Sequence, residues 1–197
     1  WRELKSYIEG KDFLKEIEKI KKIKPTQALA TRDINGDILT QIAQILPNMF
    51  GGSADVATST MAFDKNAKDF CAKNYEGKLV RYGVREHAMG AISNGLAIHK
   101  LRPFASTFFA FVDYLKPAIR MSGLSHLPVV YIFSHDSIAV GEDGPTHHPI
   151  EQLTMIRSIP NVDVIRPADA NETKEAYKIA FSKTDSPTCI VLSRQAL

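Results

Sequence analysis

Residues that could do chemistry are concentrated in one segment, residues 135–149. It holds three histidines and three carboxylates among glycines and prolines, a composition typical of a polar loop. The segment follows residues 128–134, an apolar run of β-branched and aromatic side chains that predicts a strand buried on both faces. Because open parallel sheets bind ligands at the carboxyl ends of their strands, the loop predicts a ligand site at that edge.

Four other apolar runs also end in polar side chains. These side chains are Ser53 after Met49-Phe50, Arg85 and Glu86 after residues 79–84, Arg166 after residues 162–165, and Ser193 and Arg194 after residues 189–192. Polar residues end most strands, so any one position has a plain structural explanation. Together, the five strand ends favour a binding site on one rim.

The chain alternates between runs typical of strands and runs typical of helices. Helices are expected near residues 34–46, 86–100, 110–122, 150–157 and 170–182, and strands near residues 48–52, 79–84, 103–107, 128–134, 162–166 and 188–193. Such alternation requires crossover connections, and it predicts a three-layer α/β/α domain with a mostly parallel sheet. A length of 197 residues suits one such domain.

Composition excludes several classes of function. The net charge is only +3 and much of the lysine excess lies in the first 24 residues, so no basic face predicts nucleic-acid binding. No apolar run approaches the roughly 18 residues of a membrane span, and no signal peptide is evident. Cys71 and Cys189 have neither metal nor redox spacing, which is typical of reduced thiols in a cytoplasmic protein.

Residues 1–24 form a charged segment that precedes the alternating pattern. Phe13, Ile17, Ile20 and Ile23 recur at helical spacing, and Lys24-Pro25 ends the run. We expect a helical connector from a separate amino-terminal domain.

A second signal lies in residues 81–91, where a strand turns through Gly83 into a helix rich in small residues. Glu86 falls in the first helical turn, where the helix dipole stabilises a carboxylate, so a plain role as a helix-terminus charge is open. Phe108, Phe111 and Tyr114 follow at i, i+3 and i+6, which predicts one helical face. Such stripes are usually core, but an aromatic wall beside a carboxylate suits a flat heterocycle with a ring nitrogen.

Several long motifs occur in order along the chain. They are Ala30-Thr31-Arg32, Gly51-Gly52-Ser53-Ala54-Asp55, residues 81–90, the aromatic stripe, the loop 135–149, Arg166-Pro167-Ala168-Asp169 and Leu192-Ser193-Arg194-Gln195. Together they closely resemble the central, pyrimidine-binding (Pyr) domain of transketolases, over residues 25–197. Dihydroxyacetone synthases and deoxyxylulose-phosphate synthases share much of this pattern and stay open as alternatives.

The resemblance implies thiamine diphosphate chemistry in a Pyr-module fold. Glu86 is expected to hydrogen-bond the aminopyrimidine nitrogen and so help to deprotonate the thiazolium carbon, while the cofactor does the carbanion chemistry. The resemblance also implies that Phe108, Phe111 and Tyr114 form an aromatic pocket around the pyrimidine. A sugar-phosphate clamp would consist of Arg32, Ser53, His135 and Arg194. Asp143 would recognise the configuration of the C2 hydroxyl of the sugar, and His147 would lie close to the reacting carbons. His148 matches no role.

A metal site at His135, Asp143, His147 and His148 is not predicted, because no His-x-x-x-His or Glu-paired spacing preorganises zinc. In the family, the diphosphate and a Mg²⁺ or Ca²⁺ ion are held by an amino-terminal domain with a Gly-Asp-Gly…Asn motif, which is absent from this sequence.

That absence implies that this chain owns half a site and is inactive alone. The other half is expected from the diphosphate-binding domain of a partner subunit in a homodimer. The implied reaction is two-carbon ketol transfer between sugar phosphates of the pentose phosphate pathway. A stand-alone domain that only binds a ligand or partner is the alternative.

Overall fold

The computed structural model describes Lys5, residues 16–21 and residues 28–197, and its centre is a six-stranded sheet. The strands are β1 (Met49–Ser53), β2 (Leu79–Arg81), β3 (Arg102–Phe108), β4 (Val130–Ser134), β5 (Asp163–Ile165) and β6 (Thr188–Val191). Their order is β2-β1-β3-β4-β6-β5, and every pairing is parallel. All six strands therefore end on the same side of the sheet, which we call its carboxyl edge.

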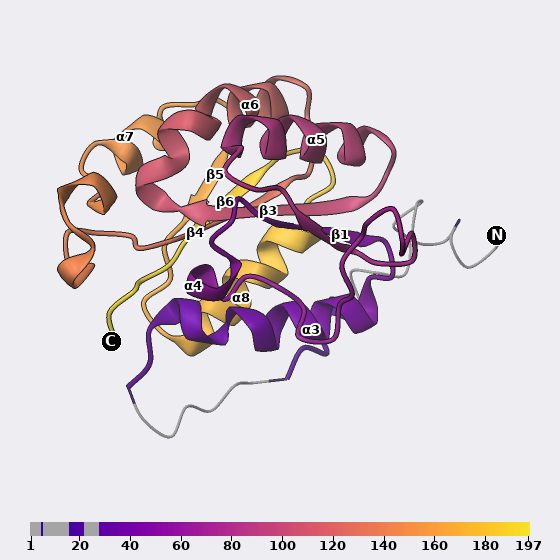
Figure 1. Ribbon diagram of the computed structural model, residues 1–197, viewed down its shortest axis with the longest axis horizontal. Coiled ribbons are helices and arrows are strands. Elements are labelled where there is room, and N and C mark those ends of the chain that lie inside the picture. Colours follow the sequence, from indigo (N-terminus) through magenta and orange to yellow (C-terminus); the bar gives the residue numbers. More distant parts are fainter. Residues whose placement is uncertain (1–4, 6–15, 22–27) are drawn as a thin grey trace.

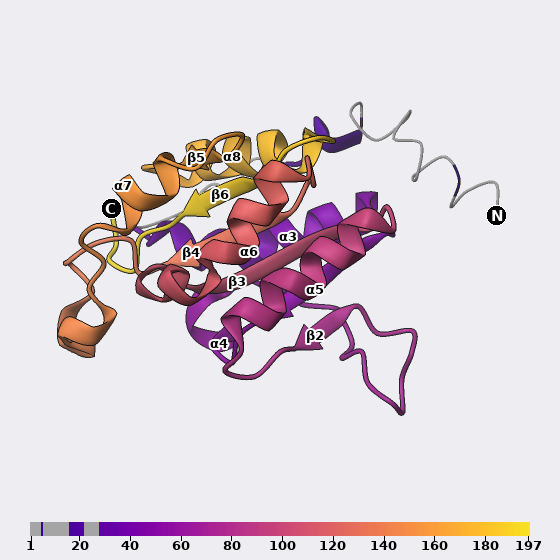
Figure 2. The same cartoon turned by 90° about the horizontal axis from the view of Figure 1, so that it is seen from above.

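Helices cover both faces of the sheet. They are α3 (Asn35–Ile45), α4 (Ala57–Thr60), α5 (Glu86–Ile98), α6 (Val112–Leu124), α7 (Gln152–Arg157) and α8 (Ala170–Ser182). Helices α5, α6 and α7 lie on one side of the sheet, and α3, α4 and α8 lie on the other (Figure 1). The predicted three-layer α/β/α architecture is confirmed, and Figure 2 shows the sheet from above, with β2 and β5 toward its opposite edges.

Strand β4 explains why the sheet is apolar on both faces. Ile132 packs in the core cluster formed with α3 and α8, whereas its neighbours Tyr131 and Phe133 pack in the cluster formed with α5 and α6. All three side chains are fully buried. Successive residues of a strand point to opposite faces, so a central strand between two helical layers has no polar face.

Helices α5 and α6 approach closely at Gly90. A Cβ atom at this position would lie 2.5 Å from Cδ1 of Leu115 and 2.6 Å from Cβ of Ala118. The run of small residues in α5 thus permits close packing against α6, as its composition predicts.

The observed elements follow the predicted ones, with a few differences. Strand β2 ends at Arg81, before the predicted residue 84, and the short helix α4 was not predicted. Within the predicted connector, Ile17 and Ile20 are buried in the core, but Phe13 and Ile23 lie outside the described residues. The helical connector over residues 1–24 therefore stays a prediction.

Cys71 is exposed and Cys189 is buried, and both are free thiols. Among the helices of the described ranges, none has the length and apolar character needed to cross a bilayer.

Candidate active site

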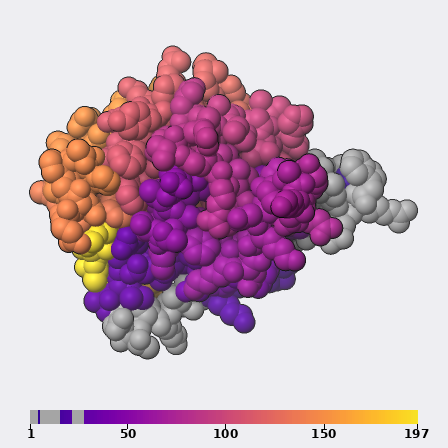
Figure 3. Space-filling model, in the orientation of Figure 1, coloured from indigo at the N-terminus to yellow at the C-terminus, as the bar shows by residue number. Residues whose placement is uncertain are grey.

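The predicted site residues gather at the carboxyl edge of the sheet. Glu86 begins α5 beyond β2, His135 directly follows β4, and Arg194 lies beyond β6. On the surface, the loop after β4 (orange), the carboxyl-terminal residues (yellow) and residues near 30 (indigo) come together at one end of the molecule (Figure 3). Segments far apart in sequence therefore form one rim.

Glu86 is a buried carboxylate with little internal support. It is the first residue of α5 and is 8% exposed. Gly83, with φ of +66°, turns the chain sharply before it. Oγ1 of Thr107 donates a long hydrogen bond of 3.4 Å to Oε1 of Glu86. A buried carboxylate normally has stronger partners than this, so Glu86 is available to a ligand.

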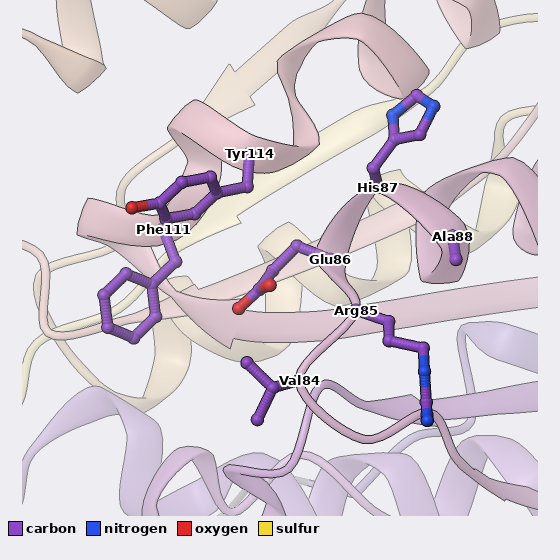
Figure 4. A pocket seen from close by; sticks show the side chains of 7 residues that line it. All are labelled: Val84, Arg85, Glu86, His87, Ala88, Phe111 and Tyr114. Atoms are coloured by element: carbon purple, nitrogen blue, oxygen red, sulfur yellow. The ribbon is translucent and has the colours of Figure 1, made fainter.

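A largely apolar pocket of about 670 Å³ opens in front of Glu86. Its lining residues are Val84, Arg85, Glu86, His87, Ala88, Phe111 and Tyr114. In Figure 4 the Glu86 carboxylate points toward the space beside Phe111 and Tyr114, while His87 and Arg85 extend away from it. Val84 is 77% exposed and Tyr114 is 65% exposed, so the pocket is open on one side.

The aromatic residues form a continuous wall, but the prediction of one helical face is wrong. Phe108 ends β3, Phe111 lies in the 3-10 turn η2 (Phe109–Phe111), and Tyr114 lies in α6. Ring centroids are 5.8 Å apart for Phe108 and Phe111, and 6.3 Å apart for Phe111 and Tyr114. A strand that passes directly into a 3-10 turn keeps the rings adjacent. Phe111 and Tyr114 line the Glu86 pocket, whereas Phe108 turns toward the histidines.

His135 is held tightly in an uncommon conformation. It is 3% exposed and has φ of +61°, in the left-handed region. Its Nδ1 forms a 2.9 Å hydrogen bond with Oγ of Ser134, and its ring lies 4.0 Å from the ring of Phe108. Backbone strain of this kind persists only where the surroundings impose it, and it is common at functional sites.

His135 is neutral in the folded domain near pH 7. Burial, together with the positive charges of Arg32 and Arg194, lowers its pKa to about 4, although Asp143 acts in the opposite direction. Nε2 of His135 lies 3.5 Å from Oδ2 of Asp143, and because the ring is neutral this contact is not an ion pair.

Two guanidinium groups flank His135. Nη1 of Arg32 donates to the carbonyl of Ser59 at 2.7 Å, while its buried Nε has no hydrogen-bond partner among the described residues. Burial lowers the pKa of Arg32, and the charge of Arg194 acts in the same direction. Nε of Arg194 lies 3.5 Å from Oδ2 of Asp143. The structure thus brings together four predicted residues: Arg32, His135, Asp143 and Arg194.

Ser53 does not join this group. Its hydroxyl donates to the carbonyl of Ser106 at 3.0 Å and accepts from the backbone N–H of Val56 at 3.3 Å, so it supports the fold. It lines a different pocket, with Asp55 and Gly83 among its neighbours. Ser59, at the α4 segment, is the serine that contacts Arg32, and sequence reasoning missed it because α4 was not predicted.

His147 lies where the pocket and the clamp meet. Its ring centroid is 5.1 Å from that of Phe111 and 5.7 Å from that of Phe108, and its Nδ1 pairs with Oγ1 of Thr146 at 2.9 Å. His148 is partly buried, and its Nε2 has no hydrogen-bond partner in the described chain. Across the described residues, no group of three or more His, Cys, Asp or Glu side chains could hold a metal ion.

The fold and the rim define a class: a parallel α/β domain that presents an apolar pocket with a buried carboxylate, next to a histidine and two arginines. Residues 27–197 match the family model of the transketolase pyrimidine-binding domain. The chain belongs to this family, whose members use thiamine diphosphate.

Individual relatives agree with this assignment. The chain is 54% identical to the transketolase of Geobacillus stearothermophilus over 170 residues, which is 86% of this chain and 25% of that protein. The crystal structure of Pichia stipitis transketolase in complex with sedoheptulose 7-phosphate superposes on the whole chain with a TM-score of 0.90 and 40% identity, covering 31% of that chain.

A more distant solved structure is a split-gene transketolase described as an inactive beta4 tetramer. It is 29% identical, with a TM-score of 0.68, over 87% of this chain and 53% of that one. The present chain spans about a quarter of the length of the Geobacillus relative, so it corresponds to one part of such a protein.

Proposed function

We propose that this chain is the pyrimidine-binding domain of a transketolase, which transfers a two-carbon ketol unit from a ketose phosphate to an aldose phosphate in the pentose phosphate pathway. The observation that carries the proposal is the contact between two groups of residues: those of the Glu86 pocket and those of the predicted clamp around Arg32 and Arg194. Phe108 links the Glu86 pocket to the Arg32/Arg194 clamp, because its ring lies against His135 and beside Phe111, which lines the pocket.

The Glu86 pocket has the donor set and shape for an aminopyrimidine. A flat ring fits beside Phe111 and Tyr114. Within the described residues, the Glu86 carboxylate accepts only a long hydrogen bond from Thr107, so it can share a stronger one with a ring nitrogen. Thiamine diphosphate supplies the carbanion chemistry when bound. Glu86 holds the proton on the pyrimidine, and the aromatic residues orient the ring and exclude water.

The clamp binds the phosphate end of the sugar. Guanidinium groups make charge-assisted hydrogen bonds to phosphate oxygens. Nε of Arg32 makes no hydrogen bond within the described residues, and it lies 3.6 Å from Oδ1 of Asp33, so it can still donate to a phosphate. The neutral His135 can donate one further hydrogen bond without adding charge. Asp143, between His135 and Arg194, is suited to read a sugar hydroxyl. Of the four predicted clamp residues, Ser53 has the least support, because its hydroxyl already donates within the fold.

His147 is the residue we assign to proton exchange with the substrate. It contacts Phe108 and Phe111, between the pyrimidine pocket and the clamp, where the reacting carbons of a sugar phosphate would lie. A histidine can both donate and accept a proton near neutral pH.

The rest of the site belongs to other parts of the protein. The open, apolar side of the pocket at Val84 and Tyr114 suits cover by a second domain. We propose that this is the diphosphate-binding domain of a partner subunit in a homodimer, which also holds Mg²⁺ or Ca²⁺. We further propose that the protein works in the cytoplasm.

The test uses the full-length protein that contains this chain, with thiamine diphosphate and Mg²⁺. Ketol transfer from xylulose 5-phosphate to ribose 5-phosphate is expected, and it should be lost in Glu86→Ala. Two further assays separate the alternatives. An enzyme that transfers the ketol unit only to formaldehyde is a dihydroxyacetone synthase. An enzyme that accepts only pyruvate as the donor, in place of a ketose phosphate, is a deoxyxylulose-phosphate synthase. No turnover in any assay, with cofactor bound, would support a non-catalytic binding domain.

A further inference from the structure

An ion pair ties the loop that carries His135 to the edge strand of the sheet. Arg166 follows β5, and its Nε and Nη2 donate to Oδ2 of Asp136 at 2.9 and 2.6 Å. The Asp136 side chain is only 5% exposed and that of Arg166 is 41% exposed. Removal of the guanidinium would leave a buried carboxylate without its cation, which a folded protein tolerates poorly.

The ion pair connects the two strands that flank β6. In the sheet order β4-β6-β5, Asp136 lies beyond β4 and Arg166 lies beyond β5. Arg194 emerges from the segment after β6, between them. The Asp136–Arg166 contact therefore fixes the spacing of the strand ends on both sides of Arg194.

The same contact bears on the backbone of His135. Asp136 is the next residue, so its anchored side chain restricts the left-handed turn at His135, where φ is +61°. A non-glycine residue keeps this conformation only when its surroundings hold it. Ser134 and Phe108 hold the imidazole ring, and Asp136 holds the chain that follows.

We propose that Arg166, acting through Asp136, is a positioning residue of the anion clamp. It holds the His135 turn and the start of the loop 135–149 against Arg32 and Arg194. This role rests on the proposed function, since it matters only if the clamp binds a substrate phosphate.

The experiment compares KM for a phosphorylated ketose donor with KM for an unphosphorylated ketol donor, in the full-length enzyme. Arg166→Ala and Asp136→Asn should each raise KM for the phosphorylated donor about tenfold. For the unphosphorylated donor, kcat and KM should each stay within about twofold of the wild-type values. The double variant should be no worse than the worse single one, because both remove one contact. Arg166→Lys should recover part of the loss.

A matched control is Lys183→Ala, which removes the ion pair with Asp163 at the opposite end of β5. It should leave both KM values unchanged. If Arg166→Ala raises KM while Asp136→Asn leaves it unchanged or lowers it, Arg166 contacts the phosphate itself and the positioning role is wrong. Equal losses with both donors, or additive losses in the double variant, would also overturn it. If Arg166→Ala does not fold, Arg166→Lys and Asp136→Asn decide between the same outcomes.

Arg32→Ala separates the two proposals. If it raises KM for the phosphorylated donor and Arg166→Ala does not, only the positioning role fails. If neither variant affects KM for the phosphorylated donor, the clamp does not bind phosphate, and both proposals fail.

Discussion

Phe108 and His135 lie ring against ring, with centroids 4.0 Å apart and planes inclined by 39°. Phe108 also contacts Phe111, which lines the Glu86 pocket, so adjacent aromatic rings connect this pocket to His135 and its neighbouring arginines. Small displacements of reacting groups cost large factors in rate. Under the proposed function, this chain of rings holds residues from separate strands in place to act on one substrate.

The first prediction concerns Glu86. In the full-length enzyme, Glu86→Ala and Glu86→Gln should cut kcat by at least ~10²-fold, the usual contribution of a positioned acid–base group. Deuterium exchange at the thiazolium carbon of bound cofactor should slow in parallel. Folding should survive, because a carboxylate in the first helical turn contributes only about 0.3–1 kcal/mol through the dipole. Wild-type exchange combined with a large fall in thermal stability would identify Glu86 as a structural cap.

The second prediction concerns the clamp arginines. Arg32→Ala or Arg194→Ala should remove a charge-assisted contact of about 1.5–3 kcal/mol, and so raise KM for phosphorylated sugars by roughly one to two orders of magnitude. Unphosphorylated acceptors should be affected much less. Steady-state kinetics with both kinds of acceptor check this, and an equal loss with each would assign the arginines a role other than phosphate binding.

The third prediction concerns acid stability and His135. Its pKa of about 4 in the folded domain lies below the ordinary value of 6.5. As the pH falls from 6.5 toward 4, His135 binds a proton in the unfolded chain but not in the folded domain. The contribution of His135 to the free energy of unfolding therefore falls in this window and levels off below it. Thermal-unfolding midpoints at pH 7 and pH 5 should differ less in His135→Asn than in the wild type. Identical differences would mean that other groups cause the acid sensitivity.

The fourth prediction concerns the packing of α5 on α6. Gly90→Ala should destabilise the domain by about 1–3 kcal/mol, because the added methyl group overlaps Leu115 and Ala118. Gly95→Ala in the same helix is the matched control, because no other part of the described structure lies within 4 Å of its Cβ position. Alanine is the better helix former, so this control should be neutral or stabilising by up to about 1 kcal/mol. Equal effects in chemical denaturation would contradict the close approach.

The fifth prediction concerns the 197-residue chain by itself. It should bind thiamine diphosphate weakly and catalyse no ketol transfer, with or without Mg²⁺, because the contacts of Glu86 and the aromatic wall alone must offset association costs of several kcal/mol. Calorimetric titration that gave micromolar or tighter binding would refute it.

Local sequence was sufficient for the architecture. Runs such as residues 128–133 carry apolar or aromatic side chains throughout, and only a strand between two helical layers buries both faces. Regular alternation of strands and helices then requires parallel crossovers, so the common edge of the strand ends followed without coordinates. Local sequence also predicted that Glu86 lies in the first turn of α5, because Gly83 and the run of small residues mark the start of this helix.

The distribution of roles around the rim was decided by tertiary structure. Sequence spacing placed Phe108 on a helix with Tyr114, but Phe108 pairs with Ser134 of β4 and so stays in the sheet, with its ring next to His135. The Ser53 hydroxyl donates a hydrogen bond to the adjacent strand. The backbone carbonyl of Ser59 reaches Arg32 because of a short helix that has no strong sequence pattern. Periodicity reports which face of an element is buried, whereas the partner of each side chain depends on how distant elements pack together.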